Sequence, residues 1–215
     1  MNWTKSFQSF LLAAIVIPTN SLKDWKTEKF SSVPKNETTA SPNGLLIQVK
    51  SSAGPLIFPL KSKIKIVGFK IRGEFQGLPK ISNPSLQGEK GSDDYPLRLG
   101  FVIPGEKKLS GFKKMIAARW VKNLYEQVKD GTGIDSIHFF NVTQNHQQVG
   151  KTRTHPASEL FQEEFFAEVK HSGPFAYDFQ FEKPIEAIAV WLSIDGDDTK
   201  STFDVFISNL ELQSQ

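Results

Sequence analysis

The chain has 215 residues, of which 39% are hydrophobic and 23% are charged. This globular composition excludes collagen-like and wholly disordered proteins. The formal net charge of +3 is too balanced to indicate a nucleic-acid partner, and the absence of cysteine excludes disulfides, thiolate metal sites and a cysteine nucleophile.

Residues 1–21 have the layout of a secretory signal peptide. Lys5 supplies a positive start, residues 10–17 form an unbroken apolar run, and Pro18 precedes small polar residues. The apolar run is shorter than the roughly 20 residues that span a bilayer, which makes an uncleaved anchor the weaker alternative. We therefore expect cleavage near Ser21 and a bacterial protein that is located in the periplasm, at the cell surface or outside the cell, with no transmembrane segment in the mature chain.

Two regions follow the predicted signal peptide. Residues 22–43 are rich in Ser, Thr, Lys and Pro, which predicts an extended N-terminal segment with Trp25 and Phe30 as its large side chains. From residue 44 the pattern changes to short strands separated by turn residues. We expect residues 44–215 to form a single domain.

Most of this domain reads as strands. Residues 67–75 alternate between apolar and polar side chains, which predicts a half-buried antiparallel strand, and residues 175–181 alternate in the same way with their aromatic row facing the core. Residues 185–194 are apolar at both parities, which predicts a central strand covered on both faces. Residues 203–212 predict the last strand, with a bulge near Ser208.

Residues 110–129 predict the one helix of the domain. Apolar side chains recur there about every four residues, and Asp130 and Gly131 end the pattern. Eight or nine short strands with a single helix indicate a mainly β fold. We expect a jelly-roll-like antiparallel β-sandwich with one amphipathic helix.

Two long polar segments, residues 76–94 and 143–156, predict loops, and long loops inside a compact domain are often functional. His146 and His155 lie in the second loop, where contact with solvent is the simplest expectation. The sequence shows no nucleophile elbow, phosphate-binding loop or histidine pair with catalytic spacing.

Acidic residues gather at two places. Asp93 and Asp94 directly precede a predicted strand, and Asp195, Asp197 and Asp198 form a turn after another. Several carboxylates in one loop suit Ca²⁺, which predicts a metal site at the second cluster, although Asp is also a common turn residue. If the two strands are antiparallel neighbours, the clusters share an edge. The simpler expectation is that they face solvent separately.

Aromatic and charged residues near the first cluster are candidates for ligand contacts. Sugar rings stack on exposed Trp and Tyr, whereas the 18 Phe of this chain argue mainly for core packing. We expect Trp25 and Tyr95 to make exposed contacts, and Arg98 to reach back along its strand to one carboxylate. The predicted ligand-binding residues are Asp93, Asp94, Tyr95 and Arg98.

Two stretches resemble an exported bacterial family known as domain of unknown function 3047. Residues 91–99 contain the pattern G-x-D-D-[FY]-x-x-R, and residues 185–199 contain an apolar strand followed by D-x-D-[ND]-T. The resemblance implies a jelly-roll-like sandwich similar to carbohydrate-binding modules and implies no known activity. The positions that it identifies are Asp93, Asp94, Arg98, Asp195, Asp197 and Asp198.

The sequence thus predicts an exported, non-enzymatic β-sandwich that binds a glycan or another component of the cell envelope. A hydrolase acting on envelope polysaccharide and a purely structural envelope protein are the alternatives. An aromatic-lined groove favours binding, and two facing carboxylates about 5–10 Å apart favour hydrolysis.

Overall fold

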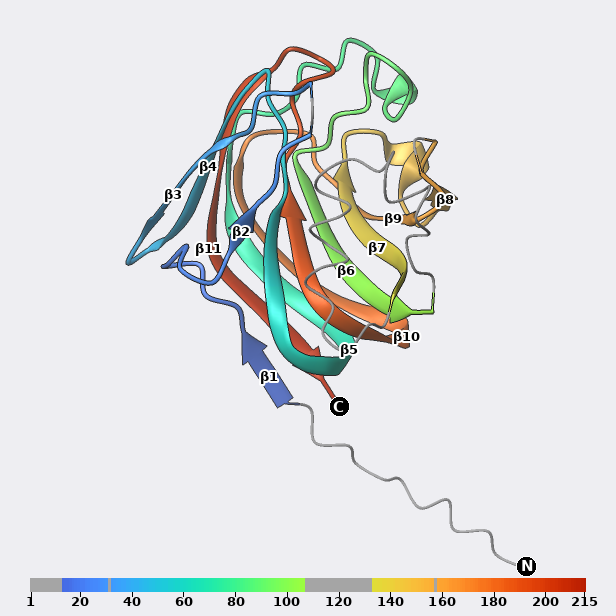
Figure 1. The fold of residues 1–215 in the computed structure, drawn as a ribbon. Coiled ribbons are helices and arrows are strands. Elements are labelled where there is room, and N and C mark those ends of the chain that lie inside the picture. Colours follow the sequence, from blue (N-terminus) through green and yellow to red (C-terminus); the bar gives the residue numbers. More distant parts are fainter. Residues whose placement is uncertain (1–12, 31, 107–132, 157) are drawn as a thin grey trace, which may run out of the picture.

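A computed structural model describes residues 13–30, 32–106, 133–156 and 158–215 (Figure 1). The described chain is mainly β, and its strands join one sheet in the order β3-β4-β11-β5-β10-β6-β7-β9-β8, with β1 on β11 and β2 on β5. The sheet is mixed because β7 and β9 run parallel. The strands are β1 (Ala13–Val16), β2 (Lys26–Thr27), β3 (Glu37–Ser41), β4 (Gly44–Lys50), β5 (Leu56–Gln76), β6 (Leu97–Gly105), β7 (Gly133–Thr143), β8 (Thr152–Thr154), β9 (Phe161–Glu168), β10 (Gly173–Ser193) and β11 (Thr202–Ser214).

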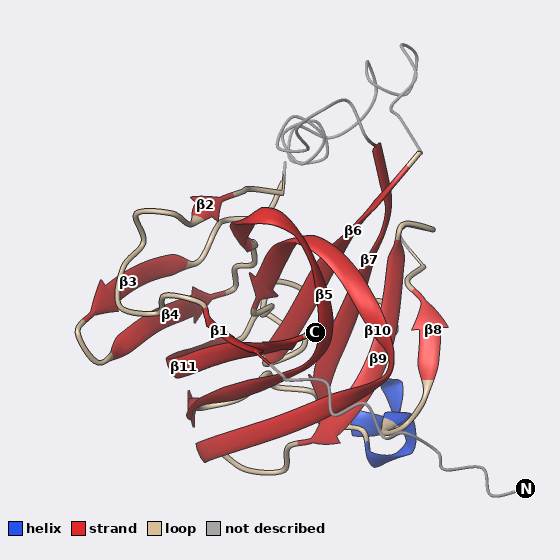
Figure 2. Cartoon of the chain, turned by 90° about the horizontal axis from the view of Figure 1, so that it is seen from below, coloured by secondary structure: helices blue, strands red, loops and turns tan. Residues whose placement is uncertain are grey.

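Two strands of 21 residues, β5 and β10, lie at the middle of the sheet. They join one half, made of β3, β4 and β11, to the other half, made of β6, β7, β9 and β8. The second half of β5 pairs with β11 and with the first half of β10, while the second half of β10 pairs with β6. The segments 175–181 and 185–194, expected as separate strands, are therefore continuous. Pro184 lacks an N–H for the ladder, and the register between β10 and β5 shifts between Gln180 and Ile185. Both strands, β5 and β10, curve strongly (Figure 2).

The main core lies between the two halves of the curved sheet. Apolar side chains of β4, β5 and β11 form one cluster with side chains of β6 and β7. Phe69 lies at its centre, with its ring centroid 5.6 Å from that of Phe140 and 6.3 Å from that of Phe101. The row from Phe175 to Phe181 packs against this cluster, as predicted. A mainly β fold is confirmed, and the finer jelly-roll topology stays a prediction.

A smaller apolar cluster covers the opposite face of β6, β7 and β10. Successive side chains of a strand point to opposite faces, so Val190 and Leu192 enter the main core while Ala189 and Trp191 join the smaller cluster. The prediction of a central strand covered on both faces is thus confirmed for β10. The bulge expected near Ser208 is also confirmed, by a register shift at that residue.

The described N-terminal residues pack onto the domain. β1 pairs with β11, and Ile17 is 1% exposed within the main core. Trp25 is 7% exposed, and its indole nitrogen donates to the carbonyl oxygen of Pro18 at 2.7 Å, so the expectation of an exposed Trp25 is wrong. The apolar part of the side chain packs in the main core, and its one polar atom donates a hydrogen bond to a main-chain oxygen.

Two predictions about helices and membranes have different outcomes. The amphipathic helix over residues 110–129 lies outside the described residues. Within the described ranges, no helix is long and apolar enough to cross a membrane. The signal peptide over residues 1–21 stays a prediction.

Candidate functional site

The two acidic clusters meet at one edge of the sheet. β6 and β10 are antiparallel neighbours, and Arg98 lies opposite Ser193 in the register. The loop before β6 therefore lies beside the turn after β10, and the main-chain nitrogen of Asp195 donates to the carbonyl oxygen of Tyr95 at 3.1 Å. The expectation that the clusters face solvent separately is wrong.

Asp94 and Asp198 tie the two loops together. The buried carboxylate of Asp94 accepts hydrogen bonds from the main-chain nitrogens of Thr199, at 2.7 Å, and Asp198, at 3.3 Å. In return, the carboxylate of Asp198 accepts from the main-chain nitrogens of Gly91, at 2.6 Å, and Asp93, at 3.0 Å. These two predicted site residues thus act as links between loops, which accounts for their place in the sequence without a ligand.

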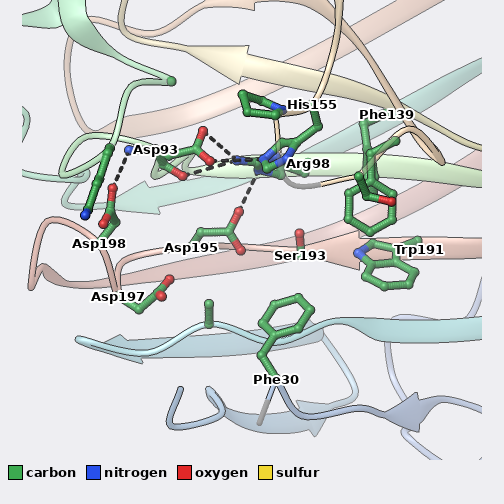
Figure 3. Close-up of a pocket in the computed structure, with 16 residues that line it drawn as sticks. Phe30, Asp93, Arg98, Phe139, His155, Trp191, Ser193, Asp195, Asp197 and Asp198 are labelled. Atoms are coloured by element: carbon green, nitrogen blue, oxygen red, sulfur yellow. Dashed lines mark hydrogen bonds and ion pairs between the residues drawn. The ribbon is translucent and has the colours of Figure 1, made fainter. Parts of the chain in front are cut away.

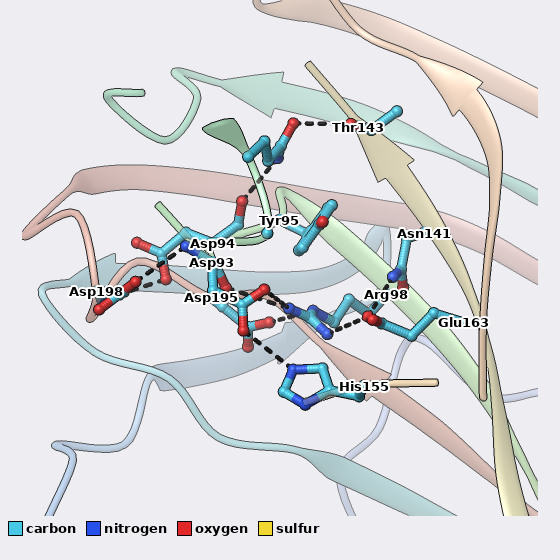
Figure 4. A network of polar contacts seen from close by, with 12 residues as sticks. Asp93, Asp94, Tyr95, Arg98, Asn141, Thr143, His155, Glu163, Asp195 and Asp198 are labelled. Carbon is cyan, nitrogen blue, oxygen red and sulfur yellow. Dashed lines mark hydrogen bonds and ion pairs between the residues drawn. The ribbon is translucent and has the colours of Figure 1, made fainter. Parts of the chain in front are cut away.

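Arg98 is the centre of a buried charged cluster (Figure 4). The guanidinium is 2.7 Å from the Glu163 carboxylate and 2.6 Å from that of Asp195, and it also donates to the carbonyl oxygen of Asp93 at 3.2 Å. Arg98 is only 6% exposed. With the Asp93 carboxylate at 3.5 Å, the expected contact with one carboxylate is a contact with three, because the loop before β6, strand β9 and the turn after β10 converge on Arg98.

Glu163 is the member of this cluster that the sequence analysis missed. Its carboxylate accepts hydrogen bonds from Arg98, from Arg153 at 2.6 Å and from the amide nitrogen of Asn141 at 2.7 Å, and the residue is 1% exposed. The available signal was its parity on β9, which it shares with the buried Phe165. A glutamate on the buried face of a strand needs a cation as partner.

Tyr95 does not make the exposed contact that we expected. The residue is fully buried, the Arg98 guanidinium lies 4.3 Å from its ring centroid, and the amide of Gln148 donates to its hydroxyl at 3.3 Å. Burial raises the pKa of Tyr95 to about 12. The ring packs against the guanidinium of the charged cluster and is not accessible to a ligand.

His155 also lies elsewhere than expected. Its ring nitrogen Nε2 is 3.0 Å from a carboxylate oxygen of Asp93, and its side chain is 13% exposed. Burial acts to raise the pKa of Asp93, but the hydrogen bond with His155 and the charges of Arg98 and Arg153 outweigh burial, so the pKa is lowered. The expectation of a solvated His155 is wrong because β8 places this residue beside the acidic edge.

Two carboxylates of the turn after β10, those of Asp195 and Asp197, have raised pKa values. Burial raises the pKa of Asp195 to about 7; Arg98 opposes this rise, and the negative charges of Asp94 and Asp197 add to it. Burial also raises the pKa of Asp197, with Asp94 and then Asp198 contributing. Neighbouring carboxylates thus add to a rise in pKa that burial causes in the first place.

A cavity of about 650 Å³ opens beside this edge (Figure 3). One end is polar and the other aromatic, and both are built on the outer face of β6, β7 and β10. The polar end is lined by Asp93, Arg98, His155, Ser193, Asp195, Asp197 and Asp198. The aromatic end is lined by Phe30, Phe139, Phe161 and Trp191.

The aromatic end is a packed wall. Phe139 lies edge-on to Trp191, with ring centroids 5.7 Å apart, and edge-on to Phe161 at 5.5 Å. Trp191 and Phe139 are nearly buried, whereas Phe161 and Phe30 are half-buried. Phe161 and Phe30 therefore present most of the accessible ring surface, and the other two rings support them.

The arrangement gives no support to the predicted calcium site at Asp195, Asp197 and Asp198. Among the residues that the structure describes, no group of three or more His, Asp or Glu side chains is placed to hold a metal ion. Asp195 is directed to Arg98, and Asp198 to main-chain N–H groups. Calcium binding stays a prediction without a coordinating cluster.

Comparison with known proteins adds little to this description. No family model matches the chain, and no curated protein matches it. The resemblance to domain of unknown function 3047 therefore stays a prediction.

Two solved structures match the chain at low similarity. The "xylan-binding module CBM15" has 9% identity and a TM-score of 0.39, covering 94% of this chain and 97% of that one. The "Crh5 transglycosylase in complex with NAG" has 9% identity and a TM-score of 0.23, covering 93% and 88%. Identities and TM-scores this low define neither the fold nor the ligand of the chain.

Proposed function

We propose that the protein is a non-enzymatic binding module that holds a glycan in the cavity beside β6, β7 and β10. The supporting observation is that one cavity of about 650 Å³ has aromatic rings at one end and carboxylates at the other. A sugar has an apolar ring face and a rim of hydroxyl groups, so it needs both kinds of contact. The volume lies in the range of about 300–1,000 Å³ that is usual for ligand sites.

The acidic end offers hydrogen-bond acceptors in fixed positions. Asp93 is held by Arg98, Arg153 and His155, and Asp195 is held by Arg98 at 2.6 Å. An ionised carboxylate has about four acceptor sites, so three partners at Asp93 and one at Asp195 still leave lone pairs for sugar hydroxyls. Side chains that are already fixed lose little conformational entropy when a ligand binds, which favours affinity.

A polysaccharide hydrolase is the second candidate. The observation in its favour is Asp195, whose pKa of about 7 would suit a general acid at neutral pH. Hydrolysis of a glycosidic bond needs two available carboxylates, however, and Asp195 and Asp93 are both engaged by Arg98. Among the other described carboxylates of the cavity, Asp198 accepts two main-chain N–H groups, which leaves Asp197 as the one that neither Arg98 nor another loop engages, so binding is the better-supported function.

We also propose that the protein works outside the cytoplasm, on a glycan of the cell envelope. The support is the order of charge, apolar run, Pro18 and small residues in the first 21 positions. Intact-mass analysis of cell fractions tests this location and gives the cleavage point. A full-length chain found only in the cytoplasm would contradict it.

A glycan array followed by titration calorimetry and a product assay tests the binding function. We expect a hit from an envelope-type glycan, no release of shorter sugars, and at least tenfold weaker binding by Phe161→Ala, which removes one of the two half-buried rings of the cavity. Phe175→Ala is the matched control, because Phe175 is a half-buried ring that packs on the main core instead. Sugar release would make the protein a hydrolase, and the absence of any hit would contradict the proposal.

A further inference from the structure

We propose that the part of β11 that β1 covers is a docking edge, which takes an extended aliphatic segment of another polypeptide once residues 1–21 have been removed. This inference rests on the proposed export and cleavage of the chain, and it does not depend on glycan binding. The observation behind it is that the apolar run expected to be cut away is built into the fold.

Residues 13–16 complete one edge of β11. β4 pairs with the first part of this edge, over residues 202–207, and β1 pairs antiparallel with residues 211–214. β5 pairs with the opposite edge of β11. Removal of β1, at the lower end of the sheet in Figure 1, therefore leaves the main-chain N–H and C=O groups of this part of β11 without their strand partner.

The residues that follow β1 continue the contact through hydrogen bonds to buried groups. The main-chain nitrogen of Ile17 donates to the carbonyl oxygen of Leu210 at 2.9 Å. The carbonyl oxygen of Pro18 accepts from the indole nitrogen of Trp25 at 2.7 Å. Cleavage after Ser21 would leave Leu210 and Trp25 in the protein without these partners, and a buried polar group that loses its partner destabilises the fold.

The side chains of the same segment show what fits this edge. Ile17 is 1% exposed within the main core and Ile15 packs against that core, whereas Val16, between them, is 65% exposed. Loss of Ile17 would leave a hole in a core that is otherwise closely packed. An extended backbone that pairs with β11 and carries aliphatic side chains two residues apart supplies both the missing hydrogen bonds and the missing side chains.

A peptide-exchange experiment on the full chain tests the docking edge. A specific protease site is inserted after Ser21, where the neighbouring residues Asn20 and Lys23 are exposed, and half of the purified, unprocessed protein is cut. The probe is a fluorescent peptide with the sequence of residues 13–21, followed by fluorescence anisotropy. We expect saturable binding to the cut chain, where the probe replaces the severed segment, and no binding to the uncut chain, where β1 occupies the edge.

Two variant peptides assign the binding to the buried face of the segment. Ile17→Thr should weaken binding at least tenfold, because it replaces a buried aliphatic side chain. Val16→Thr is the matched control and should bind within about threefold of the original peptide, because Val16 is exposed. Equal binding of all three peptides, or no binding to the cut chain, would overturn the proposal.

The state of the cut chain gives further outcomes. Unfolding that the peptide reverses would support the proposal, and unfolding that the peptide does not reverse would overturn it. A dimer of cut chains that the peptide does not dissociate would show that a second copy takes the edge, and would also overturn it.

Intact-mass analysis of the exported protein separates this inference from the proposed function. A chain that lacks residues 1–21 would support the docking edge. A chain that retains residues 13–21 would overturn it, because β1 would keep the edge occupied, and would leave glycan binding standing.

Discussion

Two groups of acidic residues near one edge of the sheet have different partners in the rest of the protein. In the buried cluster, Glu163 faces two guanidinium groups, Arg98 at 2.7 Å and Arg153 at 2.6 Å. At the cavity, Asp197 has no such cation among the described residues. The first kind of carboxylate is paired within the fold, and the second lines the cavity. The difference lies in the partners and not in the residue type, since both groups are acids at the ends of strands.

The largest expected effect is a loss of stability in the buried charged cluster. Glu163→Gln leaves Arg98 and Arg153 without their shared carboxylate, and breaking a buried ion pair costs about 3–5 kcal/mol. Urea unfolding should therefore show a loss of that size in the free energy of unfolding.

Glu164→Gln is the matched control, because Glu164 is the next residue and lies partly exposed, and its one ion-pair partner among the described residues is His138, at 3.6 Å. We expect it to change the free energy of unfolding by about 0.5 kcal/mol or less. Equal losses in the two variants would show that the charged cluster does not stabilise the fold.

The links between the loops should give the next largest effect. Asp94→Ala removes the acceptor for the N–H groups of Thr199 and Asp198 in a buried setting. Buried donors without a partner cost about 1–3 kcal/mol, so thermal unfolding should show a loss in that range. A change as small as that of a surface substitution would mean that the two loops hold together without Asp94.

The pH dependence of stability sharpens the comparison at Asp195. Its pKa rises from 3.8 in the unfolded chain to about 7 in the fold, so the folded state binds the proton more tightly. The stabilisation that this proton gives is fully present below pH 3.8 and is lost as the pH rises through about 7. Asp195→Asn should flatten this part of the profile of unfolding free energy against pH, measured from pH 4 to 8. The same slope in both proteins would contradict the raised pKa.

The smallest effect on stability is expected at the cavity. Asp197→Asn removes a carboxylate whose pKa is raised by burial and by the charges of Asp94 and Asp198. We expect the free energy of unfolding to stay within about 0.5 kcal/mol of wild type, or to rise slightly, in contrast to Glu163→Gln. A loss comparable to that of Glu163→Gln would place Asp197 in the structural group and remove the distinction.

Part of this picture could be predicted from the sequence. The alternation of polar and apolar residues identified the strands, because burial on one face imposes a period of two. The same pattern does not show that 175–181 and 185–194 are one strand. Pro184 lacks a main-chain N–H whether the chain continues as one strand or turns between two, so the sequence looks the same in either arrangement. The meeting of the two acidic loops followed from one assumption, that β6 and β10 are antiparallel neighbours, and this assumption is correct.

The partners of the site residues could not be predicted in the same way. Glu163 reaches Arg98, and Arg153 reaches Glu163, through the pairing of β9 with β7 and β8, which no local pattern encodes. Tyr95 looked like a ligand contact because a tyrosine beside two aspartates in a loop is usually exposed. It is buried because the Arg98 guanidinium covers its ring and Gln148 contacts its hydroxyl.

The most direct test of the account is a nuclear magnetic resonance titration of the isotope-labelled protein with the best glycan from the array. The account predicts concentration-dependent shifts of the main-chain amides of Ser193, Asp195 and Asp197, and of the Trp191 indole, which line the two ends of the cavity. Amides of β3 and of the first half of β10 should not shift. Shifts confined to those distant strands, or no shifts at a glycan concentration that saturates the calorimetric signal, would contradict glycan binding in this cavity.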